Sequence, residues 1–193
     1  IWEHGVFKSS DDGKSWTRKS NGLGAAANLR AIRVQLHADG TLFCLVTAKR
    51  GGGGFLNEGV GLYRSKDAGE AWEQINKSQA LRWPKDFTVD PKDSKTIYVG
   101  AANAGGPGEG GLYRSTDGGA AWTKLCQHGP EHFGAFLHPR RPGWIYATLA
   151  EGAPGSGLWL SKDNGAAWAP IKGLPFSVVQ RVEFDPANDN YPI

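Results

Sequence analysis

The chain has 193 residues, with 28 glycines, eight tryptophans and no methionine, and its 22 basic and 19 acidic side chains leave a net charge of +3. This length suits one domain or two, and so small a charge, spread evenly along the sequence, gives no case for nucleic-acid binding. No apolar run approaches the ~20 residues of a bilayer-spanning helix, and the given sequence carries no signal peptide.

One phrase, Ser-x-Asp-x-Gly-x-x-Trp, recurs along the chain. Its four copies begin at Ser9, Ser65, Ser115 and Ser161, and each follows a short lead-in of the type Gly-Leu-Tyr-Arg. This spacing is typical of repeat architectures whose units are propeller blades. The other defining residues are Asp11, Gly13 and Trp16; Asp67, Gly69 and Trp72; Asp117, Gly119 and Trp122; and Asp163, Gly165 and Trp168.

Each copy predicts a β-hairpin. In the third copy, Leu112–Ser115 suits a strand, Thr116–Gly119 suits a tight turn, and Ala121–Leu125 suits the returning strand. We expect the Asp to bond backbone amides of the turn and the Trp to supply a large apolar plug. Four equivalent carboxylates that point the same way cannot share one active site, so the pattern favours a structural role over catalysis or metal binding.

Another pair of strands precedes each hairpin. The clearest pair is Phe87–Pro91 and Thr96–Gly100, joined by a turn at Lys92–Lys95. Four antiparallel strands in about 45 to 55 residues are the unit of a β-propeller blade, so the predicted fold is an all-β propeller of four-stranded antiparallel blades. Stacked blades bury both faces of each sheet, which explains why Leu42–Val46 is apolar on both sides.

The four phrases resemble the Asp-box, or BNR, repeats of sialidase-type and related propellers. Similar repeats occur in sortilin-type receptors, in xyloglucan-degrading glycosidases and in a photosystem assembly factor. The resemblance covers nearly the whole chain, and it implies a propeller fold and an extracytoplasmic or secreted location. Because these families have unrelated activities, the resemblance does not choose a function.

The predicted blades are incomplete at both ends. Ile1–His4 suits the end of a second strand, whereas Val182–Pro186 suits a first strand and Tyr191–Ile193 the opening of a second. The chain is therefore either part of a larger propeller, with the remaining blades from a longer chain or a partner copy, or a ring in which both ends complete a fourth blade. Asp-box propellers usually have six or more blades, which favours the first interpretation. The predicted units are a partial blade over residues 1–24, blades over 29–78, 86–127 and 133–173, and a partial blade over 178–193.

Two other sequence matches are fortuitous. His128-x-x-Glu131-His132 fits the inverted zinc-protease motif, but that chemistry requires a helix, which Gly129-Pro130 forbids. Gly22–Ala27 fits a dinucleotide fingerprint, yet polar residues precede it and a strand is predicted after it. We therefore expect no metal and no cofactor.

The two cysteines, Cys44 and Cys126, fall on an inner and an outer strand of neighbouring predicted blades. This placement makes the Cα separation of a disulfide hard to reach. We expect two buried or half-buried thiols.

The predicted ligand site lies opposite the Asp-box turns. The loops between second and third strands, and those between blades, open on that other face near the channel, and loops on a rigid scaffold carry binding residues. Lys49–Glu58 is the longest of them. Aromatics beside Arg, Asn and Glu suit sugar binding by stacking and hydrogen bonds. The candidate ligand-binding residues are Arg50, Asn57, Glu58, Arg82, Trp83, Asp86, Glu109, Glu131, His132 and Arg181.

The sequence predicts a recognition module that binds a glycan or a protein on this loop face. A first alternative is part of a glycoside hydrolase acting on polysaccharide, and a second is a structural assembly scaffold. A sialidase would need an Arg-Ile-Pro segment, which is absent. Another glycosidase would need two carboxylates ~5 to 9.5 Å apart, a convergence that one sequence does not reveal.

Overall fold

The computed structural model describes residues 3–51, 54–77, 81–104, 108–151 and 157–185. Within these ranges the secondary structure is entirely β, so the predicted all-β class is confirmed. No helix in the described residues is long and apolar enough to cross a membrane.

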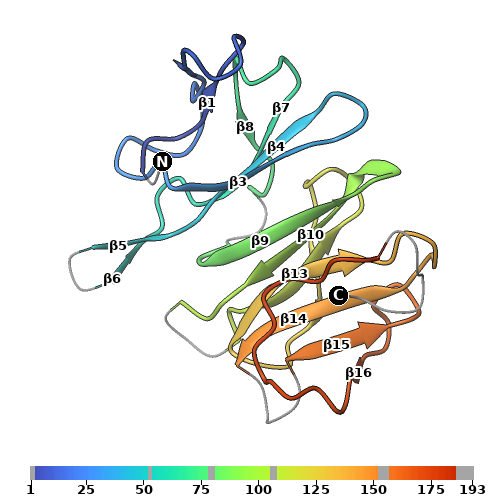
Figure 1. Ribbon diagram of the computed structural model, residues 1–193. Coiled ribbons are helices and arrows are strands. Elements are labelled where there is room, and N and C mark those ends of the chain that lie inside the picture. Colours follow the sequence, from blue (N-terminus) through green and yellow to red (C-terminus); the bar gives the residue numbers. More distant parts are fainter. Residues whose placement is uncertain (1–2, 52–53, 78–80, 105–107, 152–156, 186–193) are drawn as a thin grey trace.

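Three four-stranded antiparallel sheets form the body of the molecule (Figure 1). The first contains β3 (Ala31–Leu36), β4 (Leu42–Val46), β7 (Gly61–Ser65) and β8 (Glu73–Gln74). The second contains β9 (Pro84–Asp90), β10 (Asp93–Ala101), β11 (Gly111–Ser115) and β12 (Thr123–Cys126). The third contains β13 (Glu131–Leu137), β14 (Ile145–Glu151), β15 (Leu158–Ser161) and β16 (Ala169–Pro170).

In each sheet the strands follow one another in chain order, which is the up-and-down arrangement of a propeller blade. The first strands, β3, β9 and β13, follow one another across the middle of Figure 1. Ion pairs join β3 to β9 through Arg33 and Asp86, and β9 to β13 through Lys85 and Glu131. The fold is therefore a β-propeller, with the first strand of each sheet on the inside.

The core lies between the sheets, as β4 shows. Phe43 and Leu45 pack toward the second sheet, whereas Cys44 and Val46 pack toward the N-terminal hairpin, and all four are at most 1% exposed. Because both faces of the strand are buried, its sequence is continuously apolar instead of alternating. Sheet-on-sheet packing of this kind is what each repeat needs, since a single sheet cannot bury its own faces.

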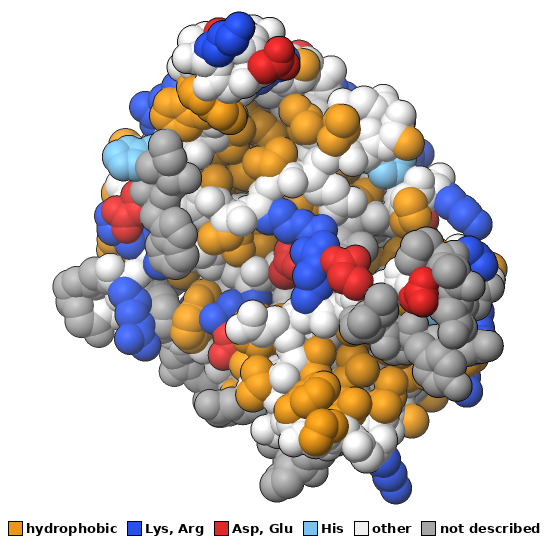
Figure 2. All heavy atoms as spheres, in the orientation of Figure 1, with side chains coloured by type: hydrophobic (Ala, Val, Ile, Leu, Met, Phe, Trp, Pro, Cys, Tyr) orange, Lys and Arg blue, Asp and Glu red, His pale blue; other side chains and the backbone are white. Residues whose placement is uncertain are grey.

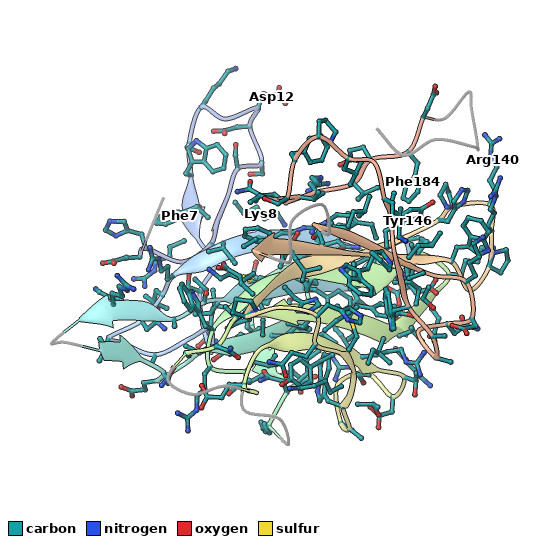
Figure 3. All side chains as sticks on the ribbon, turned by 90° about the horizontal axis from the view of Figure 1, so that it is seen from below. Phe7, Lys8, Asp12, Arg140, Tyr146 and Phe184 are labelled. Atoms are coloured by element: carbon teal, nitrogen blue, oxygen red, sulfur yellow. The ribbon has the colours of Figure 1, made fainter. Side chains whose placement is uncertain are left out.

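The N-terminal segment contributes only a hairpin, β1 (Phe7–Lys8) and β2 (Thr17–Arg18). Figure 3 shows its tip, with Asp12, standing out from the stacked sheets. In the part of the strand predicted over Ile1–His4 that the structure describes, Glu3 and His4 form a turn instead, with Glu3 at φ 72°; residues 1–2 lie outside the described ranges.

The C-terminal segment covers the outer face of the third sheet without forming the predicted strand. Residues 182–185 form no strand beyond one bridge at Phe184, and residues 186–193 lie outside the described ranges. Instead, Val179 N donates to Leu149 O at 3.0 Å, and Phe184 packs against Tyr146 with ring centroids 5.6 Å apart (Figure 3). The described part of the segment is thus held by a backbone hydrogen bond and by aromatic packing.

The segment Lys49–Glu58, which the sequence predicts as a loop, contains a second small hairpin. Here β5 (Lys49–Gly51) pairs with β6 (Gly54–Leu56), with Arg50 opposite Phe55. The prediction of a loop is wrong here, because the backbones of the two short strands pair as far as Gly51 and Gly54. Asn57 and Glu58 follow β6 and return the chain to β7.

Cys44 and Cys126 are both buried and free, as predicted. They lie on β4 and β12, in different sheets. Burial raises the pKa of each thiol to about 12, so both remain protonated and unreactive at neutral pH.

The Asp boxes join the third and fourth strands by a shared set of hydrogen bonds. In the third box, the Ser115 hydroxyl donates to Asp117 Oδ1 at 2.8 Å and accepts from Gly119 N at 2.8 Å, while Asp117 Oδ1 also accepts from Ala121 N at 2.9 Å. The same bonds form in the other three boxes. The bond from the backbone amide is the largest cause that lowers the pKa of Asp67, Asp117 and Asp163, whereas at Asp11 the largest cause is a bond from the Ser15 hydroxyl. The carboxylates are therefore structural clasps.

Two features of the structure require glycine at position 119 of the third Asp box. Its φ of 99° is left-handed, and a Cβ built there would lie 2.5 Å from the carbonyl oxygen of Ile75 in the preceding sheet. The turn thus presses against the neighbouring sheet, and a side chain would push the two apart. The clasp therefore serves packing between sheets as well as the hairpin.

Candidate functional site

The loops at the other ends of the strands meet around a groove. On that side Ala102 N donates to Trp83 O at 2.9 Å within the second sheet, and Asn103 N donates to Pro130 O at 2.8 Å, which ties a loop of the second sheet to the segment before β13. On the opposite side, Asp-box turns bond the first turn of their own sheet: Gly118 N to Lys95 O at 2.9 Å, and Asn164 N to Gly143 O at 2.9 Å. The molecule therefore has an Asp-box face and a loop face.

The groove on the loop face consists of two adjoining cavities, of about 360 and 450 Å³, that share Ile32 and Lys85. The larger is also lined by Arg33, Asp86, Phe133, Gln180 and Arg181, and the smaller by Arg30, Thr47, Ala48, Arg50, Trp83 and Pro84. In Figure 2 basic and acidic side chains gather across the middle of the molecule, between two hydrophobic areas. The sequence named several of these residues as candidates but not which of them come together, because they are far apart in the chain.

Charged side chains at the start of the inner strands organise the groove. Arg33 on β3 donates to both carboxylate oxygens of Asp86 at 2.7 Å and to Phe87 O at 2.9 Å. A cation that bonds both oxygens of a carboxylate fixes its orientation. The pair spans the first and second sheets, with side chains 26% and 22% exposed.

Lys85 holds the junction of the second and third sheets. Its ammonium pairs with Glu131 on β13 and lies 3.6 Å from the centre of the Trp83 ring. A cation over an indole face is attracted by the ring quadrupole and keeps the ring in place. The half-buried Trp83 is therefore a positioned aromatic wall of the smaller cavity.

The smaller cavity is basic. Among the residues that line it are Arg30, Arg50 and Lys85, and none is Asp or Glu. Arg30 Nη1 donates to Ala48 O at 3.2 Å, which holds that guanidinium at the wall. Positive charge beside an aromatic ring suits a ligand with an apolar face and polar or anionic substituents.

Several predicted site residues meet in this groove. Arg50, Trp83, Asp86 and Arg181 line it directly, and Glu131 joins it through Lys85. Arg181 also pairs with Glu183. Four of the predicted residues therefore line one hollow and a fifth adjoins it, and ligand binding by them stays a prediction.

The other predicted residues lie elsewhere. Arg82 pairs with Glu109 at 3.3 Å, and Arg82 and Asn57 line a separate hollow of about 490 Å³. The carbonyl of Glu58 accepts from Asn28 Nδ2 at 3.1 Å, so this residue stabilises the loop.

His132 is not available to a ligand. It is fully buried on β13, where its Nε2 accepts from His128 N at 3.1 Å, and its neighbour His128 stacks on Trp159 at 3.7 Å. Burial, with smaller contributions from His128 and Lys124, lowers the pKa of His132 to about 4. The prediction that His132 binds ligand is wrong, because strand alternation turns it into the core.

Arg33 and Lys85 were missed by sequence reasoning. The available signal was their position, because Arg33 lies within the first strand of its sheet and Lys85 directly precedes the predicted site residue Asp86. A charged residue in such a place needs either an ion partner or solvent. Among the described residues, no three His, Cys, Asp or Glu side chains converge as a metal site would require.

The fold and the repeated clasps define an Asp-box β-propeller with a charged groove across its inner strands. The chain belongs to the Sortilin-Vps10 family, whose model, described as "Sortilin, neurotensin receptor 3", matches residues 60–191. No curated protein matches the chain.

Solved propeller structures are similar to the chain. A GH74 enzyme from Niastella koreensis is 17% identical with a TM-score of 0.72, over 97% of this chain and 29% of that one. The GH74 xyloglucanase from Xanthomonas campestris is 22% identical with a TM-score of 0.59, over 90% and 28%. YCF48 from Cyanidioschyzon merolae is 13% identical with a TM-score of 0.59, over 93% and 57%. At these identities the likeness shows the fold alone, and the chain spans less than two thirds of each of these structures.

Proposed function

We propose that this propeller is a recognition module that binds a glycan or a protein in the groove of the loop face. The observation that carries the proposal is the juxtaposition of Trp83 with Arg30, Arg50 and Lys85 around one cavity. Binding sites combine an apolar wall with a few placed polar groups, and this cavity has both. The continuation of the cavity toward Arg181 gives room for an extended ligand.

The ion pairs of the groove support recognition over catalysis. Asp86 and Glu131 each pair with a cation of the protein, namely Arg33 and Lys85. Glycoside hydrolysis uses one carboxyl group to protonate the leaving oxygen and a second to attack or activate water. Carboxylates that are engaged in bridging neighbouring sheets are better suited to holding the shape of the groove.

A titration of the isotopically labelled protein tests the proposal. We expect neutral xyloglucan oligosaccharides, acidic oligogalacturonides or peptides to shift the NMR signal of the Trp83 indole in a saturable manner. Trp83→Ala should weaken binding by about tenfold or more, because stacking on an aromatic ring contributes on the order of 1–3 kcal/mol. Trp16→Ala is the matched control, since Trp16 is 62% exposed on the N-terminal hairpin. Equal affinity in the wild type and in Trp83→Ala would exclude this groove.

The alternative function is part of a glycoside hydrolase, the activity for which the GH74 structures of the same fold are named. Asp86 and Glu131, on neighbouring inner strands, are the carboxylates to examine. Release of reducing sugar from xyloglucan that is lost in Glu131→Gln would establish this alternative. A purely structural scaffold would show neither binding nor turnover.

We also propose an extracytoplasmic location, which membership of the Sortilin-Vps10 family supports. Fractionation of the native source checks it, and recovery of the protein in the cytoplasm would contradict it.

A further inference from the structure

The groove on the loop face places an aromatic ring in each of its two adjoining cavities. Trp83 lines the smaller cavity and Phe133 lines the larger one. Both side chains are half-buried, so the protein holds each ring while part of it reaches the surface. Because the cavities share Ile32 and Lys85, the two rings belong to one continuous hollow.

Positive charge accompanies the ring of the smaller cavity. Lys85 Nζ lies 3.6 Å from the centre of the Trp83 ring. Arg30 Nη1 donates to the carbonyl oxygen of Ala48, which lines the same cavity, at 3.2 Å. Arg50 on β5 is exposed and adds a third cation. The three cations come from separate segments of the chain, so the positive charge is spread along the lining of the cavity.

The carboxylates beside the groove are already bound to cations of the protein. Among the described residues that line the two cavities, Asp86 is the one acidic side chain, and Arg33 binds both of its oxygens at 2.7 Å. Glu131, which adjoins the groove, pairs with Lys85. A carboxylate that is paired in this way repels an anionic ligand less than an unpaired one, because the two opposite charges partly cancel. The groove can therefore accept negative charge.

Arg181 gives the larger cavity a cation that is only loosely engaged. It pairs with Glu183, but the two side chains are 56% and 63% exposed. Water and salt screen an ion pair this exposed, so the pair is weak. A carboxylate of a ligand can replace Glu183 at small cost. Each cavity thus combines an aromatic ring with at least one cation.

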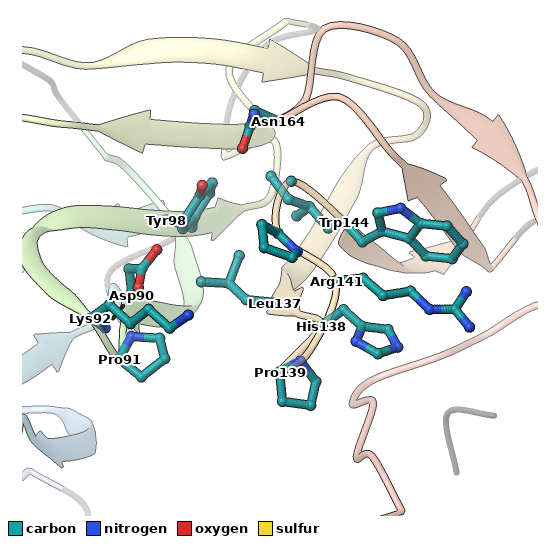
Figure 4. A pocket seen from close by; sticks show the side chains of 13 residues that line it. Asp90, Pro91, Lys92, Tyr98, Leu137, His138, Pro139, Arg141, Trp144 and Asn164 are labelled. Carbon is teal, nitrogen blue, oxygen red and sulfur yellow. Dashed lines mark hydrogen bonds between the residues drawn. The ribbon is translucent and has the colours of Figure 1, made fainter. Parts of the chain in front are cut away.

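The cavity of about 270 Å³ on the Asp-box face has cations and an aromatic ring without this arrangement. Figure 4 shows Arg141 extended beside Trp144 and pointing away from Lys92. The guanidinium of Arg141 lies 4.5 Å from the centre of the Trp144 ring. One small ligand does not meet both cations there. In the loop-face groove the two cavities adjoin, so an extended ligand meets a ring and a cation twice in succession.

A ring with a carboxylate, repeated along a chain, is the chemistry of a uronic acid glycan. Each unit of such a chain has an apolar ring face for stacking, hydroxyl groups for hydrogen bonds and a carboxylate for a cation. An acidic peptide has the carboxylates but no ring beside each of them. Aromatic walls with a few placed polar groups therefore favour the sugar.

We propose that the loop-face groove binds an acidic oligosaccharide of uronic acid units. One unit stacks on Trp83 with its carboxylate toward Arg30 and Arg50, and a second lies against Phe133 with its carboxylate toward Arg181. Guanidinium groups suit this role, because their planar donors match the two oxygens of a carboxylate. The proposal rests on the proposed function of the groove and narrows its ligand from a glycan or a protein to an anionic glycan.

A galacturonic acid trimer and its methyl ester test the proposal, because they share the sugar rings and differ in charge. We expect the trimer to shift the NMR signal of the Trp83 indole in a saturable manner and to bind about tenfold more tightly than the ester at low salt. This advantage should shrink as the concentration of sodium chloride is raised. The indole signal of Trp144, on the Asp-box face, should stay in place.

The other outcomes separate this proposal from the proposed function. If the methyl ester or a neutral xyloglucan oligosaccharide binds at Trp83 as tightly as the trimer, the choice of an anionic ligand is wrong and the proposed function stands. A glutamate peptide that binds more tightly than the trimer overturns the choice of a glycan. If none of these ligands shifts the Trp83 signal, both proposals fail.

Arg50→Gln tests where the charge of the ligand is bound. Arg50 is exposed, so the variant should fold, and its unfolding temperature verifies this. It should weaken binding of the trimer by about tenfold, which corresponds to one charge-assisted contact, and leave binding of the ester nearly unchanged. Arg181→Gln tests the larger cavity in the same way, and Arg18→Gln, on exposed β2, is the matched control. An equal loss in Arg50→Gln and Arg18→Gln, or no loss in either groove variant, overturns the proposal.

Discussion

The two faces of the propeller are built on opposite principles. On the Asp-box face one set of bonds is repeated, and the distance from the box glycine N to the serine Oγ is 2.8, 2.9, 2.8 and 2.7 Å in the four copies. On the loop face the junctions differ, with Arg33 and Asp86 at one and Lys85 and Glu131 at the next. The comparison teaches that repeated residues build the stack, whereas unrepeated residues give it a specific binding surface.

Within the Asp-box face, identical clasps contribute differently according to their neighbours. Trp72 is 5% exposed, and its Nε1 donates to Lys19 O of the N-terminal hairpin at 2.9 Å. Trp16 is 62% exposed, and its Nε1 donates to Gly13 O of its own box at 3.1 Å. The clasp forms locally in both cases, but only the buried indole joins two repeats.

The largest effect should come from Trp72→Ala. Removal of a buried aromatic side chain costs about 3–5 kcal/mol, because apolar contacts are lost and a cavity remains. Trp16→Ala should change the free energy of unfolding by no more than about 0.5 kcal/mol. Urea unfolding of both variants measures the difference, and equal costs would show that the indoles act only within their own hairpins.

Acidification should lower the free energy of unfolding because of the buried His132. Its pKa in the folded protein is about 4, below its ordinary value of 6.5, so the unfolded chain binds the proton more readily. Stability is therefore retained above pH 6.5 and falls as the pH drops toward 4, by about 3 kcal/mol in total. Unfolding curves across this range check the prediction. His132→Gln should flatten the pH dependence, and an unchanged slope in that variant would assign it to other groups.

A smaller loss is expected for Ser115→Ala, which removes the central hydroxyl of one clasp. Ser115 is 1% exposed and accepts from Gly119 N, so the buried amide would lose its partner at a cost of about 1–3 kcal/mol. Thr116→Ala, at the exposed neighbouring position, is the control. The unfolding temperatures of the two variants measure the difference. A loss of ligand affinity in Ser115→Ala would contradict the account, because this clasp lies on the face opposite the groove.

Much of the fold could be predicted because the repeat is local. Ser115, Asp117 and Gly119 lie within five residues, and their bonds form within the same turn. The site was harder to predict, because Arg33 and Asp86 meet only after the first and second sheets stack. Whether the side chain of His132 is buried depends on the register of β13, since a shift of one residue exchanges the buried and the exposed positions of a strand. The sequence did not establish that register. The pairing of β5 with β6 was also not predicted, because it is formed by backbone hydrogen bonds and a glycine-rich segment has few side chains to give a strand pattern.

The central claim is that the loop face binds the ligand whereas the Asp-box face stabilises the stack of sheets. It is tested most directly by measuring ligand affinity and the free energy of unfolding on the same two variants. Trp83→Ala should lose affinity while keeping stability to within about 1 kcal/mol, because its half-buried ring lines an open groove. Trp72→Ala should lose stability while keeping affinity under conditions where it remains folded. If each variant instead lost both properties together, the two faces would not be independent and the account would be contradicted.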